Sequence, residues 1–128
     1  MTDRVIGAIT ALSDAFRNRD LQAALACFAD DPAATYAGSE RGEVAVGPEA
    51  LRELFGSIFE RDEAYSWAIE QLWSSDRGDL QIVVAELTGM VHSSSGDTST
   101  FPYRLSGVVR IEGHATWWLM CHGAEPVE

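Results

Sequence analysis

The spacing of apolar residues changes once along this chain, and this change restricts the fold more than any other feature of the sequence. Up to Glu60 the apolar residues recur every three or four positions, as they do along one face of an α-helix. After Glu60 they alternate with polar residues, which is typical of β-strands that bury one face. The sequence therefore predicts an α+β domain whose helices precede its sheet.

Three helices are predicted in the first half of the chain. The segments "VIGAITALSDAF" and "LQAALACF" each carry an apolar stripe, and both follow residues that can cap a helix: Thr2 or Asp3 for the first and Asp20 for the second. The third segment, "GPEALRELFGSIF", has Pro48 at its first position and Glu49 in its first turn, where both residues favour a helix. The stretch 33–47 suits one or two brief extended pieces.

Three breaks, "SSDRGD", "SSSGDT" and "EG", divide the second half of the chain into four long strands. The short connections at these breaks indicate an antiparallel meander. At 128 residues the chain has the size of one domain, so residues 1–128 are expected to share a single core.

The last hairpin predicts which side chains share a face of the sheet. A turn centred on Glu112 and Gly113 aligns Tyr103 with His122, and it places Trp118 and Met120 on that same face, with Gly107 opposite Trp118. Trp117 then points to the other face. If the connection from Ser93 to Thr98 is symmetric, further residues join the Tyr103 face: Ile82, Val84, Glu86, Thr88, Met90, Trp67, Ile69 and Trp73. One extra residue in that connection would reverse the assignment.

The composition disfavours several functional classes. A net charge of -11 disfavours nucleic acids and anionic membranes as partners. All nine cationic residues are arginine, so the lysine of Schiff-base enzymes and phosphate-binding loops is missing. No apolar run reaches the roughly 20 residues of a membrane span, and the N-terminus lacks a secretion-signal pattern, so we expect a cytoplasmic protein. Cys27 and Cys121 form no CxxC motif and are expected to stay reduced.

Two stretches carry a family resemblance: "CFADDPAATYAGSERGEVAVGPEALRELF", residues 27–55, and "WWLMCHGAEP", residues 117–126. They resemble the SnoaL-like branch of the nuclear-transport-factor-2-like superfamily. The resemblance implies a cone-shaped fold, with three N-terminal helices packed in a strongly bent antiparallel sheet. The superfamily contains ketosteroid isomerases, cyclases and dehydratases, and also non-catalytic association modules. Its isomerase base falls on Tyr36 here and its second acid falls near Gly107, so the usual isomerase chemistry is not expected.

The resemblance also implies that the Gly107 face is the concave, pocket-lining face. Glu86 and His122 are the candidate catalytic residues, because a carboxylate among apolar neighbours and a histidine can both move protons. They would flank a ligand from two strands apart, and each has a structural alternative as a hydrogen-bonded or solvated side chain. The predicted ligand-binding residues are Tyr36, Trp67, Met90, Tyr103, Trp118 and Met120, of which the tryptophans have an alternative role in the core.

No metal or other cofactor is expected, since His92, His114 and His122 lack the spacing of a metal site. On the convex face, an apolar patch with two arginines predicts a homodimer: Trp117, Leu119, Val108, Val83, Leu87, Arg104 and Arg110. The leading hypothesis is a protein that binds a small apolar organic molecule, with or without cofactor-independent proton transfer of the isomerase, cyclase or dehydratase type. The alternative is a dimeric scaffold with a filled pocket. A cavity of roughly 300 Å³ that reaches Glu86, Tyr103 and His122 would favour the first hypothesis.

Overall fold

Three helices form in the first half of the chain, as the periodicity predicted: α1 (Thr2–Asn18), α2 (Leu21–Ala26) and α3 (Pro48–Phe59). The computed structural model describes residues 2–127. In α1 the apolar stripe is buried against the sheet, with Val5, Ile9 and Leu12 fully inaccessible. Asp20 caps the short helix α2, since its Oδ1 accepts a hydrogen bond from the Ala23 N–H at 3.1 Å.

Six strands form one sheet in the order β2-β1-β6-β5-β4-β3. The strands are β1 (Thr35–Ala37), β2 (Val44–Val46), β3 (Ala64–Arg77), β4 (Leu80–His92), β5 (Thr98–Glu112) and β6 (Ala115–Ala124). The α+β class is confirmed. The sheet is mixed and not antiparallel throughout, because β1 pairs in parallel with the far edge of the meander at β6.

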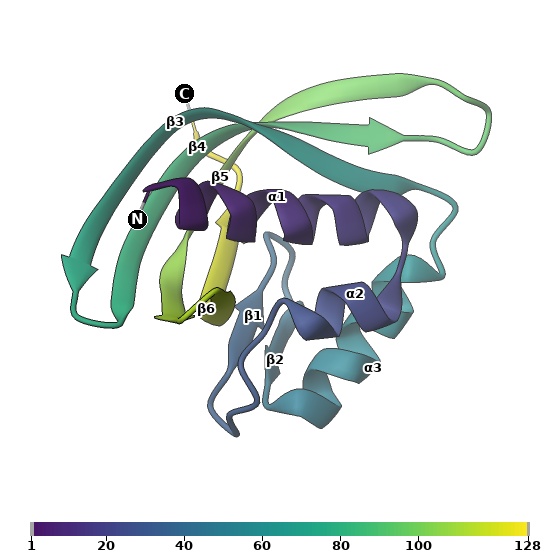
Figure 1. Cartoon of the computed structure of the whole chain (residues 1–128). Helices are drawn as coiled ribbons and strands as arrows, with labels where there is room; N and C mark the ends of the chain where they lie inside the picture. Colours follow the sequence, from purple (N-terminus) through teal and green to yellow (C-terminus); the bar gives the residue numbers. More distant parts are fainter. Residues whose placement is uncertain (1, 128) are drawn as a thin grey trace.

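The sheet bends around α1. In Figure 1 the long strands β3, β4 and β5 curve over this helix, while α2 and α3 lie beside the short strands β1 and β2. Ser13 fixes α1 to β3 because its hydroxyl donates to the Trp67 carbonyl at 3.1 Å and accepts from the Trp67 N–H at 2.9 Å. Trp118 is fully buried between helix and sheet, and its Nε1 donates to the Ala8 carbonyl at 3.3 Å. Residues 2–127 contain no helix that is long and apolar enough to cross a membrane.

The face assignment in β4 was wrong. Residues 93–97 form a loop with an odd number of residues, and His92 pairs with Thr98, so Leu87 lies opposite Tyr103 on the inner face. Because side chains alternate along a strand, the even-numbered residues of β4 turn outward. The residues misplaced in this way are Ile82, Val84, Glu86, Thr88 and Met90, whereas Val83 and Leu87, predicted on the convex face, are buried.

The position of the last turn and two β-bulges cause the remaining errors of register. The turn consists of Gly113 and His114, so Trp118 lies opposite Val109 and not opposite the predicted Gly107. In the last hairpin Val109 pairs with Trp118 but Val108 pairs with Met120, so Leu119 is the extra residue. The predicted face is therefore correct up to Trp118, and the two tryptophans point in opposite directions. Beyond the bulge, Met120 and His122 turn outward and Cys121 turns inward. A second bulge in β3, between Ile69 and Gln71, turns Trp73 outward in the same way.

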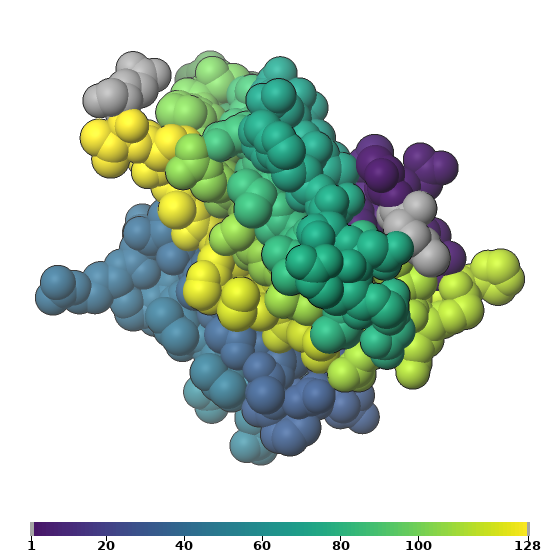
Figure 2. Space-filling view, turned by 90° about the vertical axis from the view of Figure 1, so that its left-hand side faces the viewer, coloured from purple at the N-terminus to yellow at the C-terminus, as the bar shows by residue number. Residues whose placement is uncertain are grey.

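The outer face of the sheet carries no helix. Figure 2 shows the surfaces of β3 to β6 side by side on this face. The pairing places five exposed large apolar side chains there: Val44, Val46, Trp73, Ile82 and Val84. We call these five residues, together with the half-buried Val108 and Met120 between them, the outer apolar patch.

Candidate ligand-binding site

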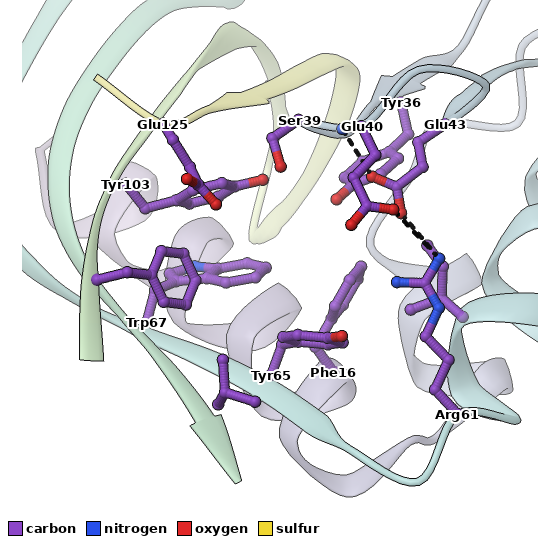
Figure 3. A pocket seen from close by; sticks show the side chains of 13 residues that line it. Phe16, Tyr36, Ser39, Glu40, Glu43, Arg61, Tyr65, Trp67, Tyr103 and Glu125 are labelled. Carbon is purple, nitrogen blue, oxygen red and sulfur yellow. Dashed lines mark hydrogen bonds and ion pairs between the residues drawn. The ribbon is translucent and has the colours of Figure 1, made fainter. Parts of the chain in front are cut away.

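A cavity of about 290 Å³ opens between α1, the end of α3, the inner face of the sheet and the loop that joins β1 to β2 (Figure 3). Six aromatic side chains from four elements form most of its wall: Phe16, Tyr36, Tyr65, Trp67, Phe101 and Tyr103. Ile58 and Val91 add apolar surface. An apolar wall with a small number of polar groups is the usual composition of a small-molecule site.

The aromatic rings of the wall hold one another in place. Phe16 lies at the centre, with its ring centroid 5.2 Å from that of Trp67 and 5.9 Å from that of Tyr36. Trp67 in turn lies 6.1 Å from Tyr103, and Phe101 meets Tyr103 edge-on at 5.6 Å. These separations are those of favourable aromatic pairs. These five rings of the wall thus support one another in a continuous chain.

Two glycines determine where the β5 rings lie. Gly89 pairs with Phe101 across the strands, and a β-carbon at Gly89 would overlap the Phe101 ring. A β-carbon at Gly123 would likewise overlap the Tyr103 hydroxyl. The two rings lie across the neighbouring backbone because these positions have no side chain. Both glycines thus contribute to the shape of the cavity without lining it.

Two phenols at the cavity wall are held in the neutral form. Burial, followed by the neighbouring Tyr103, raises the pKa of Tyr36 well above 10.0. Burial also raises the pKa of Tyr103, although its hydrogen bond with Tyr36 opposes the shift. Figure 3 shows Tyr103 extending across the cavity toward Tyr36. At neutral pH both phenols therefore keep their protons, and neither can serve as a base. Because one hydroxyl donates to the other, one donor of the pair remains for a ligand.

Four charged residues also line the cavity: Glu40, Glu43 and Arg61 lie together, and Glu125 lies beside Tyr103. We call these four residues the mouth. Arg61 Nη2 lies 3.2 Å from Glu43 Oε2 and 3.8 Å from Glu40 Oε2. Glu43 Oε1 also accepts a hydrogen bond from the Glu40 N–H at 3.1 Å. Hydrogen bonding with Tyr65, aided by Glu43, raises the pKa of Arg61, which stays charged. The mouth thus combines three carboxylates with one guanidinium.

A second hollow, of about 360 Å³, lies near the end of α1 and the loop after β4, beside Arg17, Asp62 and His92. Among residues 2–127, its wall is made of charged, polar and small residues and contains no Phe, Tyr or Trp. A site for an organic molecule is usually mostly apolar, so the aromatic cavity is the better candidate.

Comparisons with known proteins agree with the fold. A sequence profile of the SnoaL-like domain matches residues 9–118. The chain belongs to the SnoaL-like domain family. No curated protein matches the chain at a significant level.

Solved structures share the fold of this SnoaL-like chain over nearly its whole length. A proposed dehydratase of the NTF2-like family from Streptomyces avermitilis has 15% identity and a TM-score of 0.79, covering 99% of this chain and 97% of that one. A proposed aromatic ring hydroxylase from Novosphingobium aromaticivorans has 20% identity and a TM-score of 0.81, covering 99% and 91%. A ketosteroid isomerase-like protein from Erwinia carotovora atroseptica has 21% identity and a TM-score of 0.72, covering 98% and 96%. At these identities the likeness shows the fold alone.

Three of the predicted ligand-binding residues line the cavity of this SnoaL-like domain: Tyr36, Trp67 and Tyr103. Trp118 is buried under α1 and belongs to the core, which was its structural alternative. The space beside Gly107 is filled by the backbone of Met120 at the β6 bulge, and not by the Trp118 ring. Trp67 Nε1 is buried without a hydrogen-bond partner among residues 2–127, so this indole acts in the wall through its ring.

The other predicted site residues lie outside the cavity. Glu86 is on the outer face, where its Oε1 forms an ion pair with Arg104 Nη2 at 2.6 Å. His122 is exposed on the same face, and Met90 and Met120 also point outward. Their placement on the concave face was wrong, because the odd loop reverses β4 and the bulge reverses the end of β6. The cavity therefore reaches Tyr103 but neither Glu86 nor His122.

The mouth residues were missed by the sequence analysis. They come from the loop 38–43, from the position just after α3 and from the tail after β6, so no spacing in the sequence links them. The run "SERGEV" offered one signal, because acids and an arginine in a loop beside the predicted rim residue Tyr36 indicate a charged entrance. Among residues 2–127, no three His, Cys, Asp or Glu side chains lie close enough to hold a metal ion.

Proposed function

We propose that this SnoaL-like protein binds a small, mostly apolar organic molecule in the aromatic cavity. The observation that carries the proposal is a cavity of about 290 Å³ with six aromatic side chains in its wall. This volume lies at the lower end of the range for ligand sites, which begins at roughly 300 Å³. A ligand of about the size of a single substituted ring fits such a space. The hydrogen-bonded pair of Tyr36 and Tyr103 supplies one free hydroxyl donor for an acceptor group on it.

Cofactor-independent proton transfer is the catalytic form of this proposal. It needs a base inside the cavity, and Glu86 and His122 lie outside it. The carboxylates of Glu40, Glu43 and Glu125 then supply the base, while Tyr36 or Tyr103 donates to the carbonyl oxygen of the substrate. A variant with glutamine at all three positions should still bind a ketone probe but should lose exchange of its α-protons for deuterium, followed by NMR.

Binding itself is tested with the neutral probe para-tert-butylphenol, titrated against the protein by isothermal calorimetry. We expect saturable binding with one site per chain. Val91→Trp should abolish it by filling the cavity, because Val91 lies in the cavity wall. Val84→Trp is the matched control, since Val84 lies on the outer face, and it should bind the probe as the wild type does. Absence of binding to the wild type, or equal loss in both variants, would contradict the proposal.

Association into a scaffold is the second candidate function, and the outer apolar patch favours it. Exposed apolar patches of this kind usually mark an interface. We propose a second copy of the chain as the occupant. The patch is bordered by Arg104 and Glu86, which carry opposite charges, so two copies related by a two-fold axis can place each arginine beside the partner copy's glutamate. A dimer of this kind is compatible with a ligand in the cavity, because the two sites use opposite faces of the sheet.

A further inference from the structure

The charges around the aromatic cavity are unbalanced. Three carboxylates, those of Glu40, Glu43 and Glu125, face one guanidinium, that of Arg61. Arg61 lies nearest to Glu43, at 3.2 Å, and its distance from Glu40 is longer, at 3.8 Å. Glu125 forms no ion pair among residues 2–127. The mouth therefore has an excess of negative charge, in a chain whose net charge is already -11.

The unpaired carboxylate lies beside the rings. Figure 3 shows the Glu125 side chain next to Tyr103, with Trp67 beyond it. The negative charge of Glu125 also contributes to raising the pKa of Tyr103. A group placed there contacts aromatic faces on one side and a carboxylate on the other. Both surroundings attract positive charge, because the face of an aromatic ring is electron-rich.

The wall and the mouth together disfavour an anion. Within residues 2–127, Arg61 is the only cation that lines the cavity, and it already lies within 4.0 Å of two carboxylates. The phenols of Tyr36 and Tyr103 donate hydrogen bonds, but a full negative charge on the ligand would meet the uncompensated carboxylates of the mouth. A ligand with a carboxylate or phosphate group is therefore a poor fit.

From this arrangement we propose that the cavity is selective for an organic cation, an aromatic or aliphatic amine whose charged nitrogen lies between Glu125 and the rings of Tyr103 and Trp67. This inference rests on the proposed binding function and adds the charge class of the ligand to it. The apolar part of the molecule occupies the space lined by Phe16 and Phe101. The selectivity arises from cation–π attraction and from the unpaired carboxylate.

The experiment compares three probes of nearly equal size by calorimetric titration, at a pH at which their phenols are neutral. They are para-(trimethylammonio)phenol, its uncharged isostere para-tert-butylphenol and the anion para-hydroxybenzoate. We expect the cation to bind about tenfold more tightly than the isostere and the anion to bind most weakly. Equal affinity for cation and isostere would overturn the inference but leave the binding function intact. Failure of all three probes to bind would overturn both.

Removal of the Glu125 charge tests whether the preference for the cation comes from the mouth. Glu125→Gln should weaken binding of the cation about fivefold, with little effect on the isostere, because only the charged probe loses an attractive partner. Glu112→Gln is the matched control: it changes the net charge equally, and Glu112 lies at the end of β5, outside the cavity wall. Equal effects of the two substitutions would overturn the assignment, and circular dichroism verifies that both variants are folded.

Discussion

Gly107 lies within a strand and Gly7 within a helix. Backbone atoms fill the space beside Gly107, whereas the space beside Gly7 is open. A β-carbon at Gly107 in β5 would overlap the Met120 carbonyl oxygen at the β6 bulge, and backbone atoms cannot move aside easily. A β-carbon at Gly7 in α1 would meet no atom within 4 Å. Gly107 is thus required for the close approach of two strands.

Substitution of these glycines by alanine should have effects of opposite sign. We expect Gly107→Ala to lower the free energy of unfolding by about 1–3 kcal/mol through overpacking. Gly7→Ala should raise it by about 0.5–1 kcal/mol, because alanine loses less conformational entropy than glycine in a helix. Urea unfolding followed by circular dichroism measures both values. A Gly107→Ala protein as stable as the wild type would contradict the close approach.

At the scale of elements, every helix and each of the four long strands could be predicted from periodicity and breakers. The faces of the strands could not, because they depend on single residues. The connection is one residue shorter than the predicted Ser93–Thr98, and this difference reversed β4 and moved Glu86 from the inner to the outer face. The sequence of β4 is compatible with either register, because Ile82 and Val84, which point outward, are as apolar as Val83, which points inward. No glycine, proline or change of pattern in "WWLMC" predicts the bulge at Leu119.

The aromatic residues of the cavity wall were easier to predict from the sequence than the charged residues of the mouth. Tyr36, Trp67 and Tyr103 were found because the fold resemblance and the unbroken part of the register placed them. Arg61 and Glu125 lie just beyond the ends of α3 and β6, and their presence around one cavity depends on how the chain folds in three dimensions. A pattern within one strand or helix carries no information about such a meeting.

Helix α2 is short enough that its cap should matter for stability. It has six residues, and Asp20 Oδ1 accepts from the Ala23 N–H in its first turn. Asp20→Ala should lower the free energy of unfolding by about 1 kcal/mol, because the N–H loses its partner. Asp14→Ala, on the exposed side of α1, is the control and should change it by less than about 0.5 kcal/mol. Similar losses in both variants, measured by urea unfolding, would argue against a specific cap.

At the scale of the whole molecule, four buried weak acids predict how stability depends on alkaline pH. Burial raises the pKa of Cys27 from 9.0 to about 11, and it raises the pKa values of Cys121, Tyr36 and Tyr103 from their ordinary values of 9.0 and 10.0. The folded state therefore binds these protons more tightly than the unfolded state. The corresponding stability is fully present below pH 9.0 and decreases as the pH rises above it.

We accordingly expect cooperative unfolding at alkaline pH, with the tyrosinate absorbance of Tyr36 and Tyr103 appearing together with the loss of circular dichroism. A pH titration that records both signals tests this. Ionisation of the two phenols well before unfolding would show that they are accessible to solvent and would contradict the description of the cavity wall.

The outer apolar patch gives the last expectation, which concerns assembly. Ile82, Val108 and Met120 lie opposite one another on three neighbouring strands, and Val46 continues the row through β1. An apolar row that crosses the sheet is costly to expose to water, and a second copy of the chain would cover it.

In a two-fold dimer each substitution occurs twice near the axis, so Ile82→Glu should place two like charges in the interface and produce monomers. Sedimentation velocity should show a dimer for the wild type and for Ile6→Glu, a control at a side chain of similar exposure on α1. A wild-type protein that sediments as a monomer at micromolar concentrations would contradict the dimer, while binding of para-tert-butylphenol by the Ile82→Glu monomer would show that the cavity functions within one chain.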